Sequence, residues 1–358
     1  MDAFFASPEP QICRSLREAC RNGRTEIVRP ISGPDPVGEF ARSSARGLGS
    51  HPRRLESRFL YDSAGSALFE QITAQPEYYL TRTETSILAA NAARIREQTG
   101  PVTLLELGSG SSAKTDLLLR AWLDRSAKVC YLPVDVSESA LTVACSNITA
   151  RHPAARVIGV NCDYREAFPL LSQLSPALVL FLGSSIGNFP PGEMSSFLSS
   201  LAAAMRPGDF FLLGVDLVKE RSLLEAAYND KAGVTARFTR NLFVRMNREL
   251  GCAIDTDAIE HEARYNAQKE QIEISARFTR QQTFMLPPAG GRITIPAGEA
   301  VQTEISRKFR LERAVPDLKR CGFATEQVFC DELRWFALLL LRRLPLYSAR
   351  KSRPGSEK

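Results

Sequence analysis

Between residues 102 and 216, short and almost uninterrupted apolar runs alternate with amphipathic stretches. Apolar runs of this kind are typical of strands that are buried on both faces of a parallel sheet. The runs predicted to be strands are 102–108, 129–136, 156–160, 178–183 and 210–215. Helical patterns at 114–123 and 195–205 lie between them. This β-α-β-α order predicts an α/β fold with a doubly wound, mostly parallel sheet.

The alternation of apolar runs with amphipathic stretches stops after residue 218. In residues 271–285, apolar residues such as Ile272 and Ile274 alternate with polar ones, which predicts a strand with one solvated face. The pair Gly290-Gly291 predicts a turn into a further strand. The other predicted elements are helices at 221–230, 235–250 and 314–321 and strands at 292–295, 326–329 and 335–341. We therefore expect an inserted part of helices plus an antiparallel sheet, after which the chain returns to the main sheet.

The first 44 residues carry proline and glycine punctuation with weak periodicity, as in 32–36. This pattern predicts a tail or a partly ordered arm. At 358 residues, with 44% hydrophobic and 24% charged residues, the chain has the composition of a globular enzyme. Its length predicts two domains, or one domain with a large insertion.

The charge and the cysteines narrow the expected partners. The net charge of +6 lies partly near the ends, which favours solvated termini over a nucleic-acid surface. Eight scattered cysteines without a C-x-x-C pair predict reduced thiols in the cytoplasm, and three isolated histidines predict no metal site. No apolar run approaches the roughly 20 residues that span a bilayer, so we expect no membrane partner.

A glycine-rich segment follows the first predicted strand. Residues 108–113 fit G-x-G-x-x-A, in which glycines let the backbone turn sharply beside a ligand. Asp135 ends the second strand, where a carboxylate can accept hydrogen bonds from ribose hydroxyls, and Asp163-Tyr164 follows the third, beside an expected adenine. The alternatives are a helix N-cap for Asp135 and a plain loop aspartate for Asp163. A nicotinamide-dependent oxidoreductase could use the same ends, but the chain has few histidines and no second βαβ half.

The fourth predicted strand leads into Asn188, which we expect to point toward the reacting end of the ligand. Amino-methylating enzymes that act on nucleic acid often place N-P-P-Y here. In this chain Phe189 interrupts that motif and Gly192 replaces its aromatic residue, which argues against nucleic acid as a substrate. The alternative is that Asn188 is a turn residue.

Four segments together resemble the histidine Nα-methyltransferases of ergothioneine biosynthesis. They are residues 61–69 followed by Pro76-Glu77-Tyr78-Tyr79, then 106–110, 181–188 and 303–306. The similarity runs from about residue 46 to residue 343. The resemblance implies a Rossmann-like methyltransferase domain, 83–218 and 309–345, and a smaller α+β substrate-binding domain, 45–82 and 219–308, with a basic tail at 346–358. It also implies a monomer that uses S-adenosylmethionine, without a metal, to methylate L-histidine to its trimethyl betaine.

The resemblance also implies roles for individual residues. Those that would contact the donor are Tyr78, Gly108, Lys114, Asp135, Asp163 and Tyr164. Those that would bind the acceptor are Tyr61, Phe69, Asn188, Tyr228, Thr235, Ile274, Glu304 and Ser306, with Tyr61 and Asn188 catalytic. Asn188 and Tyr228 would hold the α-carboxylate, Tyr61 and Phe69 would line the amine pocket, and Glu304 and Ser306 would bind the imidazole. Ile274 stands where the family pattern has methionine, and Tyr164 stands where phenylalanine is usual.

Glu304 and Ser306 fit this role on physical grounds as well. Alternating positions on a strand place both side chains on one face, and a carboxylate with a hydroxyl can satisfy the two ring nitrogens of imidazole. The alternative for this pair is an exposed strand face. Three other functions stay open at this point: methylation of another aromatic amino acid such as tryptophan, a nicotinamide-dependent oxidoreductase, and a catalytically silent binding module.

Overall fold

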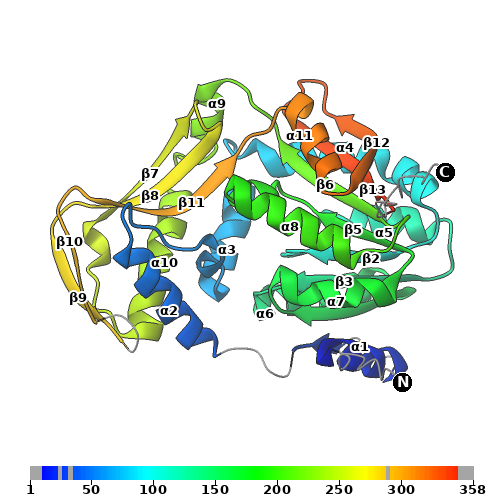
Figure 1. Ribbon diagram of the computed structural model, residues 1–358, viewed down its shortest axis with the longest axis horizontal. Coiled ribbons are helices and arrows are strands. Elements are labelled where there is room, and N and C mark those ends of the chain that lie inside the picture. Colours follow the sequence, from blue (N-terminus) through cyan, green and yellow to red (C-terminus); the bar gives the residue numbers. More distant parts are fainter. Residues whose placement is uncertain (1–9, 23–25, 31–34, 288–290, 346–358) are drawn as a thin grey trace, which may run out of the picture.

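The computed structural model describes residues 10–22, 26–30, 35–287 and 291–345. Its central element is an eight-stranded sheet (Figure 1). The strand order is β1 (Glu26–Val28), β4 (Ala155–Asn161), β3 (Val129–Asp135), β2 (Thr103–Leu107), β5 (Ala177–Phe181), β6 (Phe210–Asp216), β13 (Phe336–Arg343) and β12 (Phe323–Cys330). The first six strands run parallel, and β13 and β12 are antiparallel to their neighbours. The predicted doubly wound, mostly parallel sheet is confirmed.

Helices cover both faces of this sheet, because its strands are apolar on both sides. The helices α4 (Tyr79–Thr99), α5 (Thr115–Leu123) and α6 (Glu138–Arg151) bury their side chains in the core of one face. The core of the other face is shared by α1 (Gln11–Asn22), α7 (Tyr164–Leu174), α8 (Pro191–Ala204) and α11 (Leu311–Arg320). The winding direction reverses between β2 and β5, and ligands of open α/β sheets bind at the carboxyl ends of the strands at such a point.

A second part of the molecule lies beside the carboxyl ends of these strands (Figure 1). Its three-stranded antiparallel sheet consists of β11 (Ala300–Arg307), β8 (Gln271–Phe278) and β7 (Ile259–Asn266). A separate hairpin pairs β9 (Gln282–Leu286) with β10 (Gly291–Ile295). The remaining elements here are α2 (Pro36–Gly49), η1 (Ser57–Leu60), α3 (Ser63–Thr73), α9 (Arg221–Ala226), α10 (Val234–Leu250) and η3 (Thr256–Ala258).

Three expectations differ from the structure. The single strand predicted at 271–285 is two strands, β8 and β9, because the chain bends at residues 279–281 and β9 pairs with β10 instead. The predicted N-terminal arm contains α1, β1 and the start of α2, and the apolar face of α1 is buried: Ile12 and Leu16 are 4% and 3% exposed. The predicted boundaries at 44 and 82 fall inside α2 and α4. The tail 346–358 and Gly290 lie outside the described residues.

No helix in the described part of the chain is both long enough and apolar enough to cross a lipid bilayer.

Candidate active site

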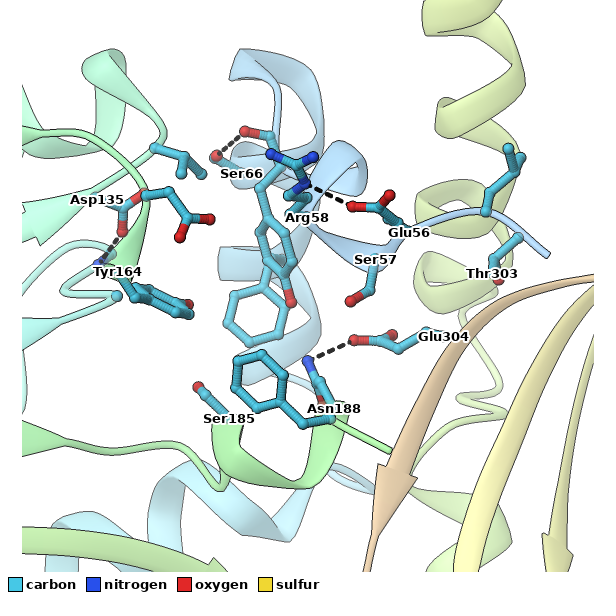
Figure 2. Close-up of a pocket in the computed structure, with 18 of the residues that line it drawn as sticks. Glu56, Ser57, Arg58, Ser66, Asp135, Tyr164, Ser185, Asn188, Thr303 and Glu304 are labelled. Atoms are coloured by element: carbon cyan, nitrogen blue, oxygen red, sulfur yellow. Dashed lines mark hydrogen bonds and ion pairs between the residues drawn. The ribbon is translucent and has the colours of Figure 1, made fainter. Parts of the chain in front are cut away.

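A cavity of about 860 Å³ lies between the carboxyl end of the central sheet and the second part of the molecule. Figure 2 shows Asp135 and Tyr164 on the side of the sheet, facing Thr303 and Glu304 from β11 across the cavity. The residues predicted to contact a nucleotide that do line this cavity are Gly108, Asp135, Asp163 and Tyr164. The structure therefore brings together segments that lie more than two hundred residues apart in the sequence, from Ser43 to Ile305.

The glycine-rich turn after β2 needs glycine at residue 108. Gly108 has a φ of +71°, and a β-carbon there would lie 2.8 Å from the Tyr164 hydroxyl. The next residues of the turn are tied to β3, since the Ser109 N–H donates to the Val134 carbonyl at 3.1 Å and the Gly110 N–H donates to the Asp135 carboxylate at 2.9 Å. The turn thus keeps a backbone surface free of side chains on the cavity wall.

Asp135 is a buried acceptor at the end of β3. Its carboxylate also accepts from the Ser137 N–H at 2.8 Å. Burial raises the pKa of Asp135, and the N–H donors of Ser137 and Gly110 oppose that rise. The N-cap of α6 is Ser137, so Asp135 does not have the alternative role of a helix cap. Its free lone pairs remain available to hydroxyls in the cavity.

Asp163 is the N-cap of α7 and forms a capping box with Glu166. It therefore has a structural role as well as a place on the cavity wall. The ring of Tyr164 packs edge-on against Phe181, with centroids 5.2 Å apart, and burial raises the pKa of its hydroxyl. The phenol of Tyr164 is thus neutral and can act as a hydrogen-bond donor.

Two residues predicted to contact the donor lie elsewhere. Lys114 does not line the cavity; its ammonium pairs with Glu84, a buried carboxylate that also accepts from the Gly183 N–H at 2.8 Å. Tyr78 lines a second, smaller chamber, where its ring lies 6.1 Å from that of Tyr228. Tyr78 therefore lies among the residues predicted to bind the acceptor.

The smaller chamber, of about 50 Å³, adjoins the large cavity. Both are lined by Tyr61, Phe69, Ser185, Asn188 and Glu304. The chamber is completed by Ile72, Tyr78, Gly183, Tyr228, Thr235, Phe238 and Ser306. All the residues predicted to bind the acceptor lie here except Ile274, which is buried in β8 at the register position opposite Glu304.

Glu304 and Asn188 meet at the junction of the two cavities. The Asn188 amide donates to the Glu304 carboxylate at 3.0 Å (Figure 2). Burial raises the pKa of Glu304 to about 7, although Lys308 and the Asn188 hydrogen bond both lower it. Glu304 therefore changes its charge near neutral pH. The strand-face alternative for Glu304 and Ser306 does not describe this placement, because both side chains face the chamber.

The aromatic rings of the chamber pack edge to face. The Tyr61 centroid lies 5.5 Å from that of Phe69 and 5.3 Å from that of Phe238. Burial raises the pKa of the Tyr61, Tyr78 and Tyr228 hydroxyls well above the ordinary value, and nearby carboxylates raise it further. These phenols stay protonated and can bind a ligand by hydrogen bonds, but they cannot act as phenolate bases.

Several residues of the site are not among those expected from the sequence. Phe238 and Ser185 line the chamber, Glu84 holds the Gly183 backbone, and Lys308 donates to the hydroxyls of Tyr228 and Ser306. Lys308 carried a usable signal, because it follows Glu304 and Ser306 at the same two-residue spacing. Glu84 and Phe238 lie in helices whose sequence patterns give no sign of a ligand site.

The sequence profile of the histidine-specific, S-adenosylmethionine-dependent methyltransferases matches residues 40–343. The chain belongs to this family. It is 41% identical over 310 residues to a histidine N-alpha-methyltransferase of Mycolicibacterium smegmatis, covering 86% of this chain and 97% of that protein. A histidine N-alpha-methyltransferase of Mycobacterium tuberculosis is 40% identical over 82% of this chain and 92% of its own length. Ergothioneine biosynthesis protein 1 of Neurospora crassa is 31% identical over 74% of this chain and 30% of its own length.

Membership of this methyltransferase family accounts for the pairing of two cavities. A group-transfer enzyme must hold its donor and its acceptor side by side, with the reacting atoms at the junction. In this chain the large cavity lies against the glycine-rich turn, and the chamber opens from it at Asn188 and Glu304. In the described part of the chain, no three His, Cys, Asp or Glu side chains are grouped so that they could hold a metal ion.

Proposed function

We propose that this protein transfers the methyl group of S-adenosylmethionine to the α-amino nitrogen of L-histidine, in successive steps, to form the trimethyl betaine from which ergothioneine is made. One observation supports this proposal above the others. The acceptor residues implied by the resemblance come from five separate segments, and all but Ile274 line one chamber beside the nucleotide-binding edge of the sheet.

The large cavity suits the donor. We assign the adenosine part to the wall formed by the Gly108 turn, Asp135, Asp163 and Tyr164, because this wall offers backbone close to the ligand, carboxylates for hydroxyl or amino groups, and an aromatic ring. For Lys114 we keep the donor role that the resemblance implies; it lines neither cavity, and its ammonium pairs with Glu84 beside Gly183. We move Tyr78 to the acceptor site, because it lines the chamber.

The chamber suits an amino acid with a polar ring. Tyr228 and Asn188 can donate hydrogen bonds to an α-carboxylate, while Glu304 can accept from a ring N–H. Tyr61 and Phe69 lie at the junction, where the amine would meet the methyl group. Thr235 also lines the chamber, and Ile274 supports the strand behind Glu304.

The reaction needs little from the protein besides orientation. The neutral amine nitrogen supplies its lone pair to the methyl carbon, the carbon–sulfur bond breaks, and the sulfur keeps the electron pair. A proton must leave the nitrogen before each attack. Because the sulfonium is already activated, alignment and exclusion of water supply most of the rate.

Incubation with a methyl-labelled donor and each of the twenty amino acids, followed by mass spectrometry, tests this function. Histidine should gain up to three methyl groups. One molecule of S-adenosylhomocysteine should accumulate for each methyl group transferred. Turnover of tryptophan in place of histidine would support the alternative acceptor. Turnover of none of the twenty amino acids would contradict the proposal and favour a binding module.

A further inference from the structure

A cluster of buried charges lies directly behind the chamber. Asp216, at the end of β6, is fully buried and pairs with two lysines, Lys308 at 2.9 Å and Lys219 at 2.5 Å. The side chain of Lys308 is 0% exposed and that of Lys219 is 6% exposed. Two ammonium groups therefore share one carboxylate in the interior.

The second ammonium is not needed to neutralise Asp216. Lys219 already supplies one positive charge, and the Tyr79 hydroxyl donates to the Asp216 carboxylate at 2.8 Å. Burying a further charge is unfavourable unless other groups compensate it. Lys308 thus brings a second positive charge to the wall of the chamber, where it also lowers the pKa of Glu304.

The hydrogen bonds of Lys308 point to this use. Its ammonium donates to the Tyr228 hydroxyl at 2.8 Å and to the Ser306 hydroxyl at 2.9 Å, so that with Asp216 all three of its N–H groups are engaged. The two hydroxyls are also hydrogen-bonded to each other at 2.7 Å, with either one able to donate, and both residues line the chamber. A ligand that accepts from both hydroxyls must therefore replace this bond. A hydroxyl that accepts from an ammonium is polarised and becomes a stronger donor of its own hydrogen.

We propose that Lys308 is a positioning residue that makes Tyr228 and Ser306 hydrogen-bond donors toward the ligand, so that the chamber selects an acceptor with lone pairs at both positions. This inference rests on the proposed function. For histidine, the α-carboxylate would accept from Tyr228 and an unprotonated ring nitrogen would accept from Ser306. The other ring nitrogen would donate to Glu304. Lys308 and Glu304 would then select the neutral imidazole in one tautomer.

Two matched variants test this role. Lys308→Met and Lys219→Met each remove one ammonium from Asp216, but only Lys308 touches the chamber hydroxyls. Lys308→Met should raise the KM for histidine by roughly ten- to a hundredfold. It should leave the affinity for S-adenosylhomocysteine within about twofold and lower the preference for histidine over tryptophan. Lys219→Met should leave all three values within about threefold.

Equal losses in the two variants would overturn the inference, because they would show that the cluster acts only through stability. The inference would also be overturned if Lys308→Met weakened the binding of S-adenosylhomocysteine as much as that of histidine. Should wild type methylate only another amino acid, the proposed function fails instead, and the two failures stay distinct.

A second test uses only the wild-type protein, so it does not depend on whether a variant folds. A pyrrolyl analogue of histidine keeps one ring N–H for Glu304 and replaces the other ring nitrogen with carbon. We expect calorimetry to show that it binds at least tenfold more weakly than histidine. Equal affinity for the two ligands would contradict the selection of a ring lone pair.

Discussion

At the scale of single residues, Glu304 changes its charge within the range of pH in which enzymes are assayed. Its pKa is raised to about 7 by burial, so it is a carboxylate above that pH and a carboxylic acid below it. Only the carboxylate is purely an acceptor toward a ring N–H. The preference for histidine should therefore change with pH around the pKa of Glu304.

Glu304→Gln tests this expectation through the pH profile. From pH 8 to pH 6 the carboxylate fraction of Glu304 falls by roughly tenfold. Over this range kcat/KM for histidine should therefore fall about tenfold more in the wild type than in the variant. Titration of free histidine affects both proteins equally and serves as the internal control. Parallel profiles in the two proteins would contradict a role for the Glu304 charge.

The same residue predicts how stability depends on pH. The folded protein holds the Glu304 proton more tightly than the unfolded chain, whose pKa is about 4.3. This residue's contribution to the free energy of unfolding therefore falls as pH rises from about 4.3 through 7. Urea unfolding should show Glu304→Gln gaining stability relative to wild type between pH 5 and pH 8. Glu106, whose pKa is also raised to about 7, is present in both proteins.

Asp135 should govern affinity for the donor. In Asp135→Asn an NH₂ group replaces one carboxylate oxygen, so the side chain can no longer accept from the Gly110 and Ser137 N–H groups and from ribose together. We expect S-adenosylhomocysteine to bind roughly ten- to a hundredfold more weakly. The control is Asp116→Asn, which changes another buried carboxylate, one that pairs with His152, and should leave the affinity unchanged. Equal affinities of wild type and Asp135→Asn would remove the ribose assignment.

At the scale of elements, the turn between β2 and α5 combines a backbone requirement with a steric one. Gly108→Ala would place a β-carbon 2.8 Å from the Tyr164 hydroxyl on a backbone with φ +71°. We expect at least a tenfold loss of donor affinity, because both the turn and Tyr164 must shift. Adding Tyr164→Phe removes the nearest contact and should restore part of the loss.

Gly100→Ala is the matched control for this turn. Gly100 also has a φ of +71°, but nothing lies within 4 Å of its added β-carbon. This variant should lose roughly 1 kcal/mol of stability from backbone strain while keeping donor affinity. If Gly108→Ala and Gly100→Ala bind the donor equally well, the contact with Tyr164 does not constrain the site.

At the scale of the whole molecule, the N-terminal arm extends the sheet outside the region that matches the family. The strand β1 pairs in parallel with β4, and Arg156 donates to the Ala19 carbonyl at 3.1 Å. The residues that line the large cavity begin at Ser43, in α2, so α1 and β1 contribute to the core and do not line the cavity.

Deletion of residues 1–34 should therefore separate stability from activity. It would expose β4 and α7, so we expect the melting temperature to fall by roughly 4–8 °C or more, while kcat/KM for histidine stays within about threefold of wild type. Leu16→Ala, which empties one buried position of α1, should give a smaller fall in melting temperature. Loss of activity in a truncated protein that remains folded would show that the arm supports catalysis.

We also propose two functional units at this scale. Residues 83–218 with 309–345 would bind the donor, and residues 45–82 with 219–308 would bind the acceptor. The helix α4 crosses the boundary at 82 and carries Glu84, which ties Lys114 to the backbone of Gly183 on the wall of the chamber.

The sequence by itself determined seven of the eight strands of the central sheet, all but β1, and the glycine-rich turn, because their signals are local. An apolar run that is buried on both faces can be recognised from consecutive residues, and so can the glycine that follows it. The two-residue spacing of Glu304 and Ser306 placed both on one face of a strand in the same way. The resemblance supplied the remaining acceptor residues, and the structure gathers most of them around one chamber.

Only the tertiary structure decided the polarity of that chamber. The hydrogen bond between Asn188 and Glu304 joins residues 116 positions apart, and Lys308 acts on Tyr228 across 80 positions. Tyr78 lies beside Tyr228, and Ile274 does not line the chamber. Both placements likewise depend on how β11, β8 and α4 pack. Periodicity records only which neighbours share a face, whereas the charge of a buried carboxyl depends on its distance from charges brought close by folding.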